Sequence, residues 1–295
     1  MIGELKSITA LRGMAVWTLI ACAAIAPPAM PFLYGLLFLL SGFTTFLSSS
    51  GRRHAGDGHE ARHYIARRLW TLMPGLAIAA SLAMLLSHGQ MAELLVAPML
   101  AMTLAVILSP FLTAQLRVQH LRRPQLLALM MVLCALLQPV DEFISADLVR
   151  QALGLLLFWI AGLLLCAFWL RGPDGDSRAL HLALAGVAAA VLLWLTGVTP
   201  PPSTAAATAL FLTLAAAHAS SLRANPAHRP AMLWIGRTAY LAWLVHLPIL
   251  AFAQPSTPLG AIGLLAVTLV VTLLLTPALG ARAWISSPQR RPSTR

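Results

Sequence analysis

The sequence has little charge, and acidic residues are its scarcest feature. Only 10% of its 295 residues are charged, with nine acidic residues against 20 basic ones, whereas soluble domains carry about 25% charged residues. At the same time, 59% of the chain is hydrophobic. A water-exposed surface needs more polar side chains than this, so the composition excludes an ordinary cytosolic enzyme, a disordered tail and a fibrous repeat. It predicts a polytopic membrane protein.

Cysteine is also scarce. The three cysteines, Cys22, Cys134 and Cys166, lie in separate apolar stretches, which excludes a disulfide framework and a Cys-x-x-Cys metal site. We interpret them as small buried hydrophobic residues. Leu19–Cys22 is similar to a bacterial lipoprotein processing box, so lipidation of Cys22 stays open as an alternative.

Long apolar runs are the dominant feature that the sequence does have. A bilayer core about 30 Å thick requires about 20 apolar residues per helix. The first run is retained as a helix, because Pro27 and Pro28 directly follow its small residues and disfavour signal-peptide cleavage. Ten candidate spans are bounded by proline, glycine or charged residues: 8–26, 31–49, 69–87, 92–114, 124–140, 151–170, 179–198, 203–220, 232–253 and 259–283.

The distribution of basic residues gives an independent test of this count. With a cytoplasmic N-terminus, 19 of the 20 basic residues fall on the inner side, and only Arg150 falls outside, as the positive-inside rule requires. The sequence therefore predicts an all-α bundle of ten transmembrane helices with both termini cytoplasmic, in a bacterial inner membrane. Residues 1–285 form one domain, and 286–295 form a basic tail predicted to be disordered. Because the basic residues are spread between apolar runs, no nucleic-acid partner is expected.

Three arginines lie at the cytoplasmic ends of predicted spans. Arg12 is in the first span, Arg68 opens the third and Arg237 lies a few residues into the ninth. One interpretation is that they are anchors whose side chains extend to lipid headgroups. The other is that their guanidinium groups converge and bind phosphate through bidentate hydrogen bonds.

One histidine lies deep in a predicted span. His246 is about 14 residues into the ninth span, or about 21 Å from its inner end. An imidazole at this depth is unfavourable unless it faces a polar partner, so His246 is either a functional group or a structural histidine bonded to a backbone carbonyl. His54, His59 and His63 lie in the basic loop without a cysteine or carboxylate set, so no metal site is expected.

Four ordered segments resemble motifs of acyltransferase family 3, integral-membrane enzymes that O-acylate carbohydrates and other acceptors. The predicted span count also fits, so the resemblance covers nearly the whole chain. The segments are Ile8–Ala15 with its Leu-Arg-Gly, Phe38–Phe43 with Ser41-Gly42, Tyr64–Pro74 with Arg68, and Ile235–Pro248 with Tyr240 and His246; Phe158–Leu165 is a weaker fifth match.

This resemblance implies an acyltransferase that transfers groups other than aminoacyl groups. The acyl group would pass from a cytoplasmic acyl-coenzyme A to a hydroxyl of a carbohydrate or lipid-linked acceptor at the membrane. Acyl-coenzyme A is then a co-substrate, and no bound cofactor is expected. The resemblance assigns Arg12, Arg68 and Arg237 to phosphate binding and Ser41, Gly42 and Tyr240 to structural motifs. His246, the histidine deep in the predicted bundle, is the candidate catalytic base or acceptor-orienting group.

The sequence departs from the family at a central position. Family members carry a histidine eleven positions after the first-helix arginine, taken as the catalytic base, but this chain has Ala23 there. Loss of a positioned base typically lowers the rate by about 10²- to 10⁴-fold. Thr71 replaces a second arginine of the third-helix motif, and the charged Trp-Ser-Leu-x-x-Glu segment has no clear counterpart. Two alternatives stay open: an inactive scaffold or partner subunit in surface-polysaccharide assembly, and a small transporter of neutral substrates.

Overall fold

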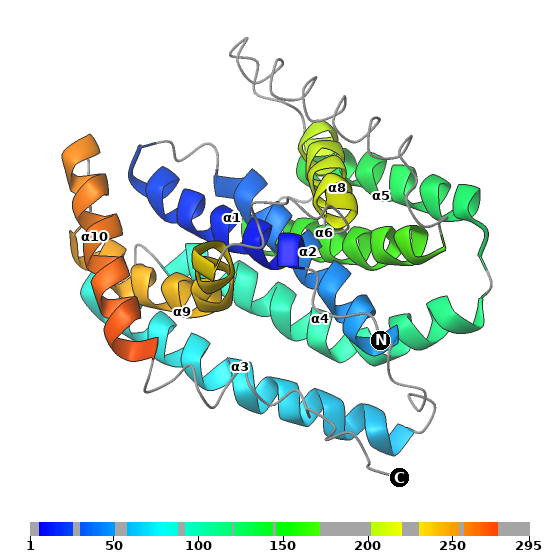
Figure 1. Cartoon of the computed structure of the whole chain (residues 1–295), viewed down its shortest axis with the longest axis horizontal. Coiled ribbons are helices and arrows are strands. Elements are labelled where there is room, and N and C mark those ends of the chain that lie inside the picture. Colours follow the sequence, from blue (N-terminus) through cyan, green and yellow to red (C-terminus); the bar gives the residue numbers. More distant parts are fainter. Residues whose placement is uncertain are drawn as a thin grey trace.

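The computed structural model describes residues 6–25, 30–50, 58–87, 92–119, 121–143, 146–171, 202–219, 230–253 and 257–276. Nearly all residues in these ranges are helical, and the ranges contain no strand. The helices, labelled as in Figure 1, are α1 (Lys6–Ile25), α2 (Met30–Ser50), α3 (Gly58–Ser87), α4 (Ala92–Val118), α5 (Arg123–Phe143), α6 (Asp147–Leu170), α8 (Pro202–Ala219), α9 (Pro230–Ala253) and α10 (Pro258–Leu275).

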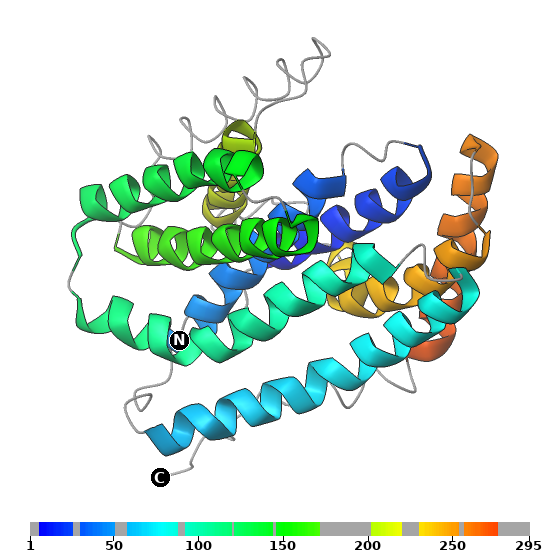
Figure 2. The same ribbon diagram turned by 180° about the vertical axis from the view of Figure 1, so that it is seen from behind.

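Two helices, α6 and α9, each contact several others. Helix α6 contacts α2, α4, α5 and α8, whereas α9 contacts α1, α3 and α10. Contacts between α1 and α2 and between α3 and α4 join the two groups. Figure 2, seen from behind, shows α3 along one edge, followed by α4, α6 and α5. Helix α9, which comes late in the sequence, therefore packs against α1 and α3, which come early in it.

The interior and much of the exterior are both apolar. Buried side chains such as Leu39, Phe43 and Trp159 form a continuous core. On the outer faces of α3, α5 and α10, large hydrophobic side chains are also exposed, including Trp70 at 84% and Leu259 at 79%. A helix in a water-soluble bundle carries polar residues on this side. An apolar outer face is instead typical of a helix that contacts lipid.

Three helical segments are long and apolar enough to cross a membrane, Val96–Val118, Asp147–Leu170 and Pro230–Leu250. Shorter apolar segments occur in α1, α2, α5, α8 and α10. The prediction of an all-helical fold is therefore confirmed for the described residues, and three of these helices have the length and composition that a membrane span requires. Ten spans and cytoplasmic termini stay predictions, and both the predicted span 179–198 and the tail 286–295 lie outside the described residues.

One predicted boundary needs correction. The third span was expected to begin at residue 69, after the basic loop that contains His54, His59 and His63. Helix α3 instead begins at Gly58, so its first eleven residues are mostly polar and include Arg67 and Arg68. Hydropathy marks the apolar part of a helix only. Arginine, alanine and glutamate have good helix propensity, so the helix extends beyond its apolar run.

Candidate functional site

Helices α1 and α9 meet backbone to backbone at two glycines. A Cβ atom on Gly13 would lie 2.6 Å from the backbone nitrogen of Gly236. A Cβ atom on Gly236 would in turn overlap the carbonyl oxygen of Thr9. Only glycine permits so close an approach, which is a common way for helices to associate inside a membrane. These two glycines belong to the first and last motifs of the family resemblance.

Two of the predicted phosphate-binding arginines flank this crossing. Arg12 directly precedes Gly13, is partly buried, and donates through Nη2 to the carbonyl oxygen of Gly236 at 3.4 Å. Arg237 directly follows Gly236 and is exposed. The glycine contact therefore brings these two positions, 225 residues apart in the chain, to the same end of the α1–α9 pair.

Helix α3 joins the same region through Tyr240. The Tyr240 hydroxyl donates to the carbonyl oxygen of Leu72 at 3.0 Å, and a Cβ atom on Gly75 would touch Leu244 of α9 at 3.0 Å. Arg68 lies one turn before Leu72, is exposed, and acts electrostatically on the Tyr240 phenol. The third-helix motif is therefore anchored to α9 beside its arginine.

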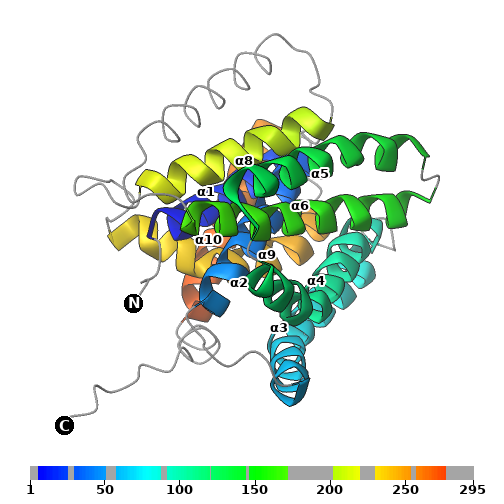
Figure 3. The same cartoon turned by 90° about the vertical axis from the view of Figure 1, so that its right-hand side faces the viewer.

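The first-helix and third-helix motifs therefore both contact the motif on α9. Arg12 from α1, Arg68 from α3 and Arg237 from α9 itself lie around its first half, and we name these three residues the arginine junction. Figure 3 shows the N-terminal parts of α1 and α9 on the same side of the bundle. A set of guanidinium groups at one end of a bundle is suited to a phosphate-bearing ligand, because arginine presents paired N–H donors to phosphate oxygens.

His246 lies farther along α9 and is completely buried. Its Nδ1 is hydrogen-bonded to the carbonyl oxygen of Trp243. Because a carbonyl only accepts, Nδ1 carries the proton and Nε2 carries the lone pair. Nε2 is buried and has no hydrogen-bond partner among the described residues. The predicted bond to a backbone carbonyl is present, and it leaves the other nitrogen as a proton acceptor.

The level of His246 in the bundle is also informative. Figures 1 and 3 show α1 and α9 running in the same general direction. Ala23 lies ten residues beyond Gly13, and His246 lies ten residues beyond Gly236. Both positions are therefore about 15 Å along their helices from the crossing. The backbone of Ala23 belongs to α1, while the side chains of Cys22, Ala23 and Thr71 lie outside the described residues.

The second-helix motif lies elsewhere. A Cβ atom on Gly42 of α2 would overlap the carbonyl oxygen of Trp159, and one on Gly162 of α6 would overlap that of Leu39. Ser41 is partly buried, and its carbonyl oxygen accepts hydrogen bonds from the hydroxyls of Thr44 and Thr45. Gly42 therefore belongs to an α2–α6 contact rather than to the arginine junction, and the bonds to Ser41 lie within α2.

Sequence reasoning did not single out several buried polar groups near α9. The indole nitrogen of Trp17 on α1, and the hydroxyls of Thr268 and Thr272 on α10, are buried without a hydrogen-bond partner. The sequence signal that could have identified the α10 hydroxyls is the i, i+4 spacing of Thr268 and Thr272 in an otherwise apolar run. Within the described ranges, no group of three histidine, cysteine or acidic residues is arranged to hold a metal ion.

Comparison with known proteins leaves this geometry as the main guide to function. No protein-family model matches the chain, and neither a curated protein nor a solved structure matches it.

Proposed function

We propose that this protein is an integral, multi-pass membrane acyltransferase of the bacterial inner membrane. It transfers an acyl group from cytoplasmic acyl-coenzyme A to a hydroxyl of a carbohydrate or lipid-linked acceptor. The observation that carries the proposal is the assembly of three motifs on α9, with a buried proton acceptor on the same helix. The resemblance to acyltransferase family 3 supplies the identity of the substrates.

In this proposal the arginine junction binds the phosphates of the coenzyme. Arg12 is held at the α1–α9 crossing by its bond to Gly236, and Arg68 lies close enough to Tyr240 to act electrostatically on its phenol. The reaction centre lies about 15 Å farther along α9, at the level of His246. This separation suits a ligand whose phosphates are joined to its reactive thioester by a long, flexible and uncharged arm.

His246 acts as the general base. The acceptor hydroxyl transfers its proton to His246 Nε2 while its oxygen attacks the thioester carbonyl carbon. The new ester C–O bond forms, the C–S bond breaks, and the coenzyme leaves as a thiolate that regains the proton. The bond from Nδ1 to Trp243 favours this role, because it fixes the tautomer in which Nε2 accepts. His246 thereby replaces the histidine that the family carries at the position of Ala23.

The alternative function is an inactive scaffold or partner subunit in surface-polysaccharide assembly. It is favoured by one observation, the alanine at position 23, whose methyl group cannot accept a proton. In this case the helix contacts are retained for assembly, and His246 has a structural role only.

Turnover of acetyl-coenzyme A by the purified protein in nanodiscs distinguishes these functions. Wild type is compared with His246→Ala and Ala23→His, with His63→Ala as a control because His63 is an exposed histidine. The proposal predicts thioester cleavage or transfer that is lost in His246→Ala, by about 10²-fold or more, and retained in His63→Ala. A silent wild type that gains activity in Ala23→His supports the inactive alternative. Absence of coenzyme binding contradicts acyl transfer altogether.

A further inference from the structure

Helix α10 carries two threonines whose hydroxyls differ from most others in the bundle. Thr268 and Thr272 are completely buried, and neither Oγ1 has a hydrogen-bond partner in the described part of the chain. A helical threonine ordinarily donates to a carbonyl one turn back. Seven threonines in the described helices do so: Thr44, Thr45, Thr103, Thr113, Thr213, Thr238 and Thr276.

These two hydroxyls belong to the inner face of α10. Leu264, Thr268 and Thr272 are buried at a spacing of four residues, and the flanking residues Val267 and Leu269 are exposed. Helix α10 contacts α9 and α1. The buried stripe therefore faces those two helices, and the polar atoms lie on the side opposite to lipid.

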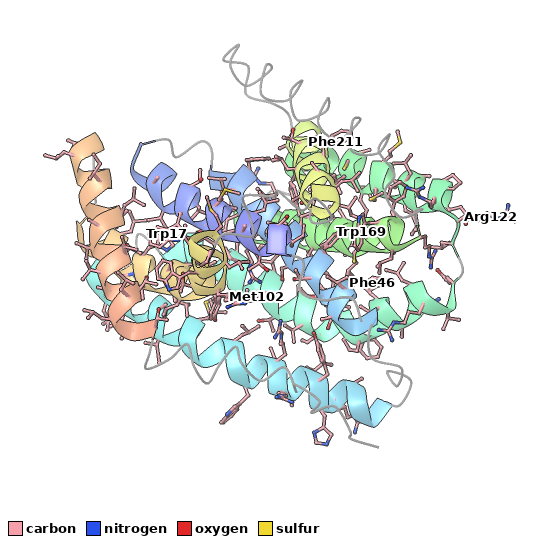
Figure 4. All side chains as sticks on the ribbon, in the orientation of Figure 1. Trp17, Phe46, Met102, Arg122, Trp169 and Phe211 are labelled. Carbon is pink, nitrogen blue, oxygen red and sulfur yellow. The ribbon has the colours of Figure 1, made fainter. Side chains whose placement is uncertain are left out.

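The helices opposite this stripe contribute three more buried polar atoms without partners in the described part of the chain: Trp17 Nε1 of α1, and Trp243 Nε1 and His246 Nε2 of α9. Trp17 lies one turn beyond Gly13 on the same face of α1, and Figure 4 shows it on the side of α1 nearer α9 and α10. We name Trp17, His246, Thr268 and Thr272 the polar seam. Its members come from three helices that all contact one another.

The four groups also lie within the same stretch of the bundle. His246 is seven residues before the end of α9, and Thr268 is ten residues after the start of α10. Because α10 follows α9 after a short connection, these positions are about 10 Å and 15 Å from it. Thr272 is one turn deeper, toward the level of Trp17. The polar seam therefore extends from His246 in the direction of the arginine junction.

The hydrogen-bonding capacity of the seam defines what it can bind. An indole N–H only donates, the Nε2 of His246 only accepts, and a threonine hydroxyl does both. None of the four side chains carries a charge when the imidazole of His246 is neutral. A buried polar group without a partner is unfavourable, and a cluster of four in one interface points to a ligand. We infer that the polar seam binds the neutral reacting groups of the two substrates, the acyl carbonyl and the acceptor hydroxyl.

This inference rests on the proposed acyl transfer and extends it to specific binding residues. Thr268 and Thr272 are assigned to substrate binding, with Trp17 as a donor toward the carbonyl oxygen. The phosphates of the coenzyme are excluded from the seam, because none of its residues is cationic. Binding of the coenzyme and binding of the reacting groups are therefore separable by mutation.

Threonine-to-valine substitution tests this assignment, because it removes the hydroxyl and preserves the shape. Thr268→Val and Thr272→Val are compared with Thr213→Val, which is equally buried but has a hydroxyl bonded to the carbonyl oxygen of Ala209 at 2.8 Å. Three quantities are measured in nanodiscs or detergent: acetyl-coenzyme A hydrolysis with water as acceptor, affinity for free coenzyme A, and the unfolding temperature.

Both α10 variants are expected to lose about tenfold or more in hydrolysis rate, equivalent to one lost hydrogen bond to the reacting groups. Their affinity for free coenzyme A and their unfolding temperature are expected to stay unchanged or to rise. Thr213→Val is expected to be less stable, with the same hydrolysis rate per folded molecule.

Each other outcome has a defined meaning. If wild type hydrolyses acetyl-coenzyme A and the α10 variants match Thr213→Val, the polar seam is not a substrate site, while acyl transfer stands. If the α10 variants lose stability in parallel with activity, their hydroxyls are structural and the inference is overturned. If wild type neither binds nor cleaves acetyl-coenzyme A, the inference fails together with the proposed function.

Discussion

Two pairs of helices in this protein cross through facing glycines, and their surroundings differ. At the α2–α6 crossing, Gly42 and Gly162 each meet the backbone of the other helix, and the neighbouring Leu39, Phe43 and Trp159 are almost completely buried. At the α1–α9 crossing, Gly13 and Gly236 make the same kind of contact. Here, however, an arginine adjoins each glycine in the sequence.

The difference distinguishes a crossing surrounded by apolar side chains from one that is flanked by arginines. Helices in a bilayer gain little from the hydrophobic effect between them, so close packing through small residues supplies much of their association. At the α2–α6 crossing, the buried neighbours Leu39, Phe43 and Trp159 are apolar. A close glycine crossing therefore does not require arginines, and we propose that those at the α1–α9 crossing are retained for phosphate binding.

The largest expected effect comes from filling the apolar crossing. Gly42→Ala introduces a Cβ atom at the position of the Trp159 carbonyl oxygen, so α2 and α6 must separate at the centre of the bundle. We expect a loss of more than about 3 kcal/mol in unfolding free energy, at the upper end for overpacking. The measurement is thermal unfolding in detergent, with size-exclusion chromatography to detect aggregation.

Gly263→Ala is the matched control for that substitution. Gly263 is exposed on α10, and an added Cβ atom would meet nothing within 4 Å. Because alanine favours helix by up to about 1 kcal/mol over glycine, this variant is expected to be as stable as wild type or more so. A Gly42→Ala protein as stable as this control would contradict the close α2–α6 contact.

An intermediate effect is expected at the other crossing. Gly236→Ala places a Cβ atom against the carbonyl oxygen of Thr9 and moves α1 away from α9. We expect a loss of about 1–3 kcal/mol in stability, because this pair lies farther from the α6 group. Coenzyme A affinity is expected to fall by at least about tenfold, since Arg12 and Arg237 separate. Retained affinity in a folded Gly236→Ala protein would show that the two crossings do not differ in function.

The smallest effect is expected at the contact between α3 and α9. Tyr240→Phe removes the hydrogen bond to the Leu72 carbonyl oxygen, which is worth about 0.5–1.5 kcal/mol in stability. We expect a fall of a few degrees at most in unfolding temperature and a modest loss of coenzyme A affinity, because Arg68 becomes less well held. An unchanged unfolding temperature would mean that this bond does not hold α3 against α9.

Some of this architecture could be predicted from the sequence. Continuous apolar runs predicted the helices within a few residues in most cases, because helices in a bilayer must satisfy all backbone groups internally. The start of α3 at Gly58 was missed, since polar helical residues such as Arg62 and Arg67 give no hydropathy signal. Hydropathy also does not reveal which helices become neighbours, so it could not pair Gly13 with Gly236 or Gly42 with Gly162.

The candidate site was only partly predictable for a similar reason. Arg12, Arg68, Arg237 and His246 stand out because ionisable residues are rare in apolar segments. Thr268 and Thr272 do not, because threonine has near-neutral hydropathy and usually bonds to its own helix. Their significance depends on hydroxyls left without partners and on the contact of α10 with α1 and α9, which only the three-dimensional structure supplies.

The most direct test of the arginine junction is a comparison of coenzyme A with pantetheine, which lacks both the phosphates and the adenosine. Affinities are measured in nanodiscs for wild type, Arg12→Ala and Arg150→Ala, a control arginine paired with Asp147 on α6. We predict that wild type and Arg150→Ala bind coenzyme A at least about tenfold more tightly than pantetheine, and that Arg12→Ala loses most of this difference. Equal binding of the two ligands by wild type, or an unchanged preference in Arg12→Ala, would contradict phosphate binding at the α1–α9 crossing.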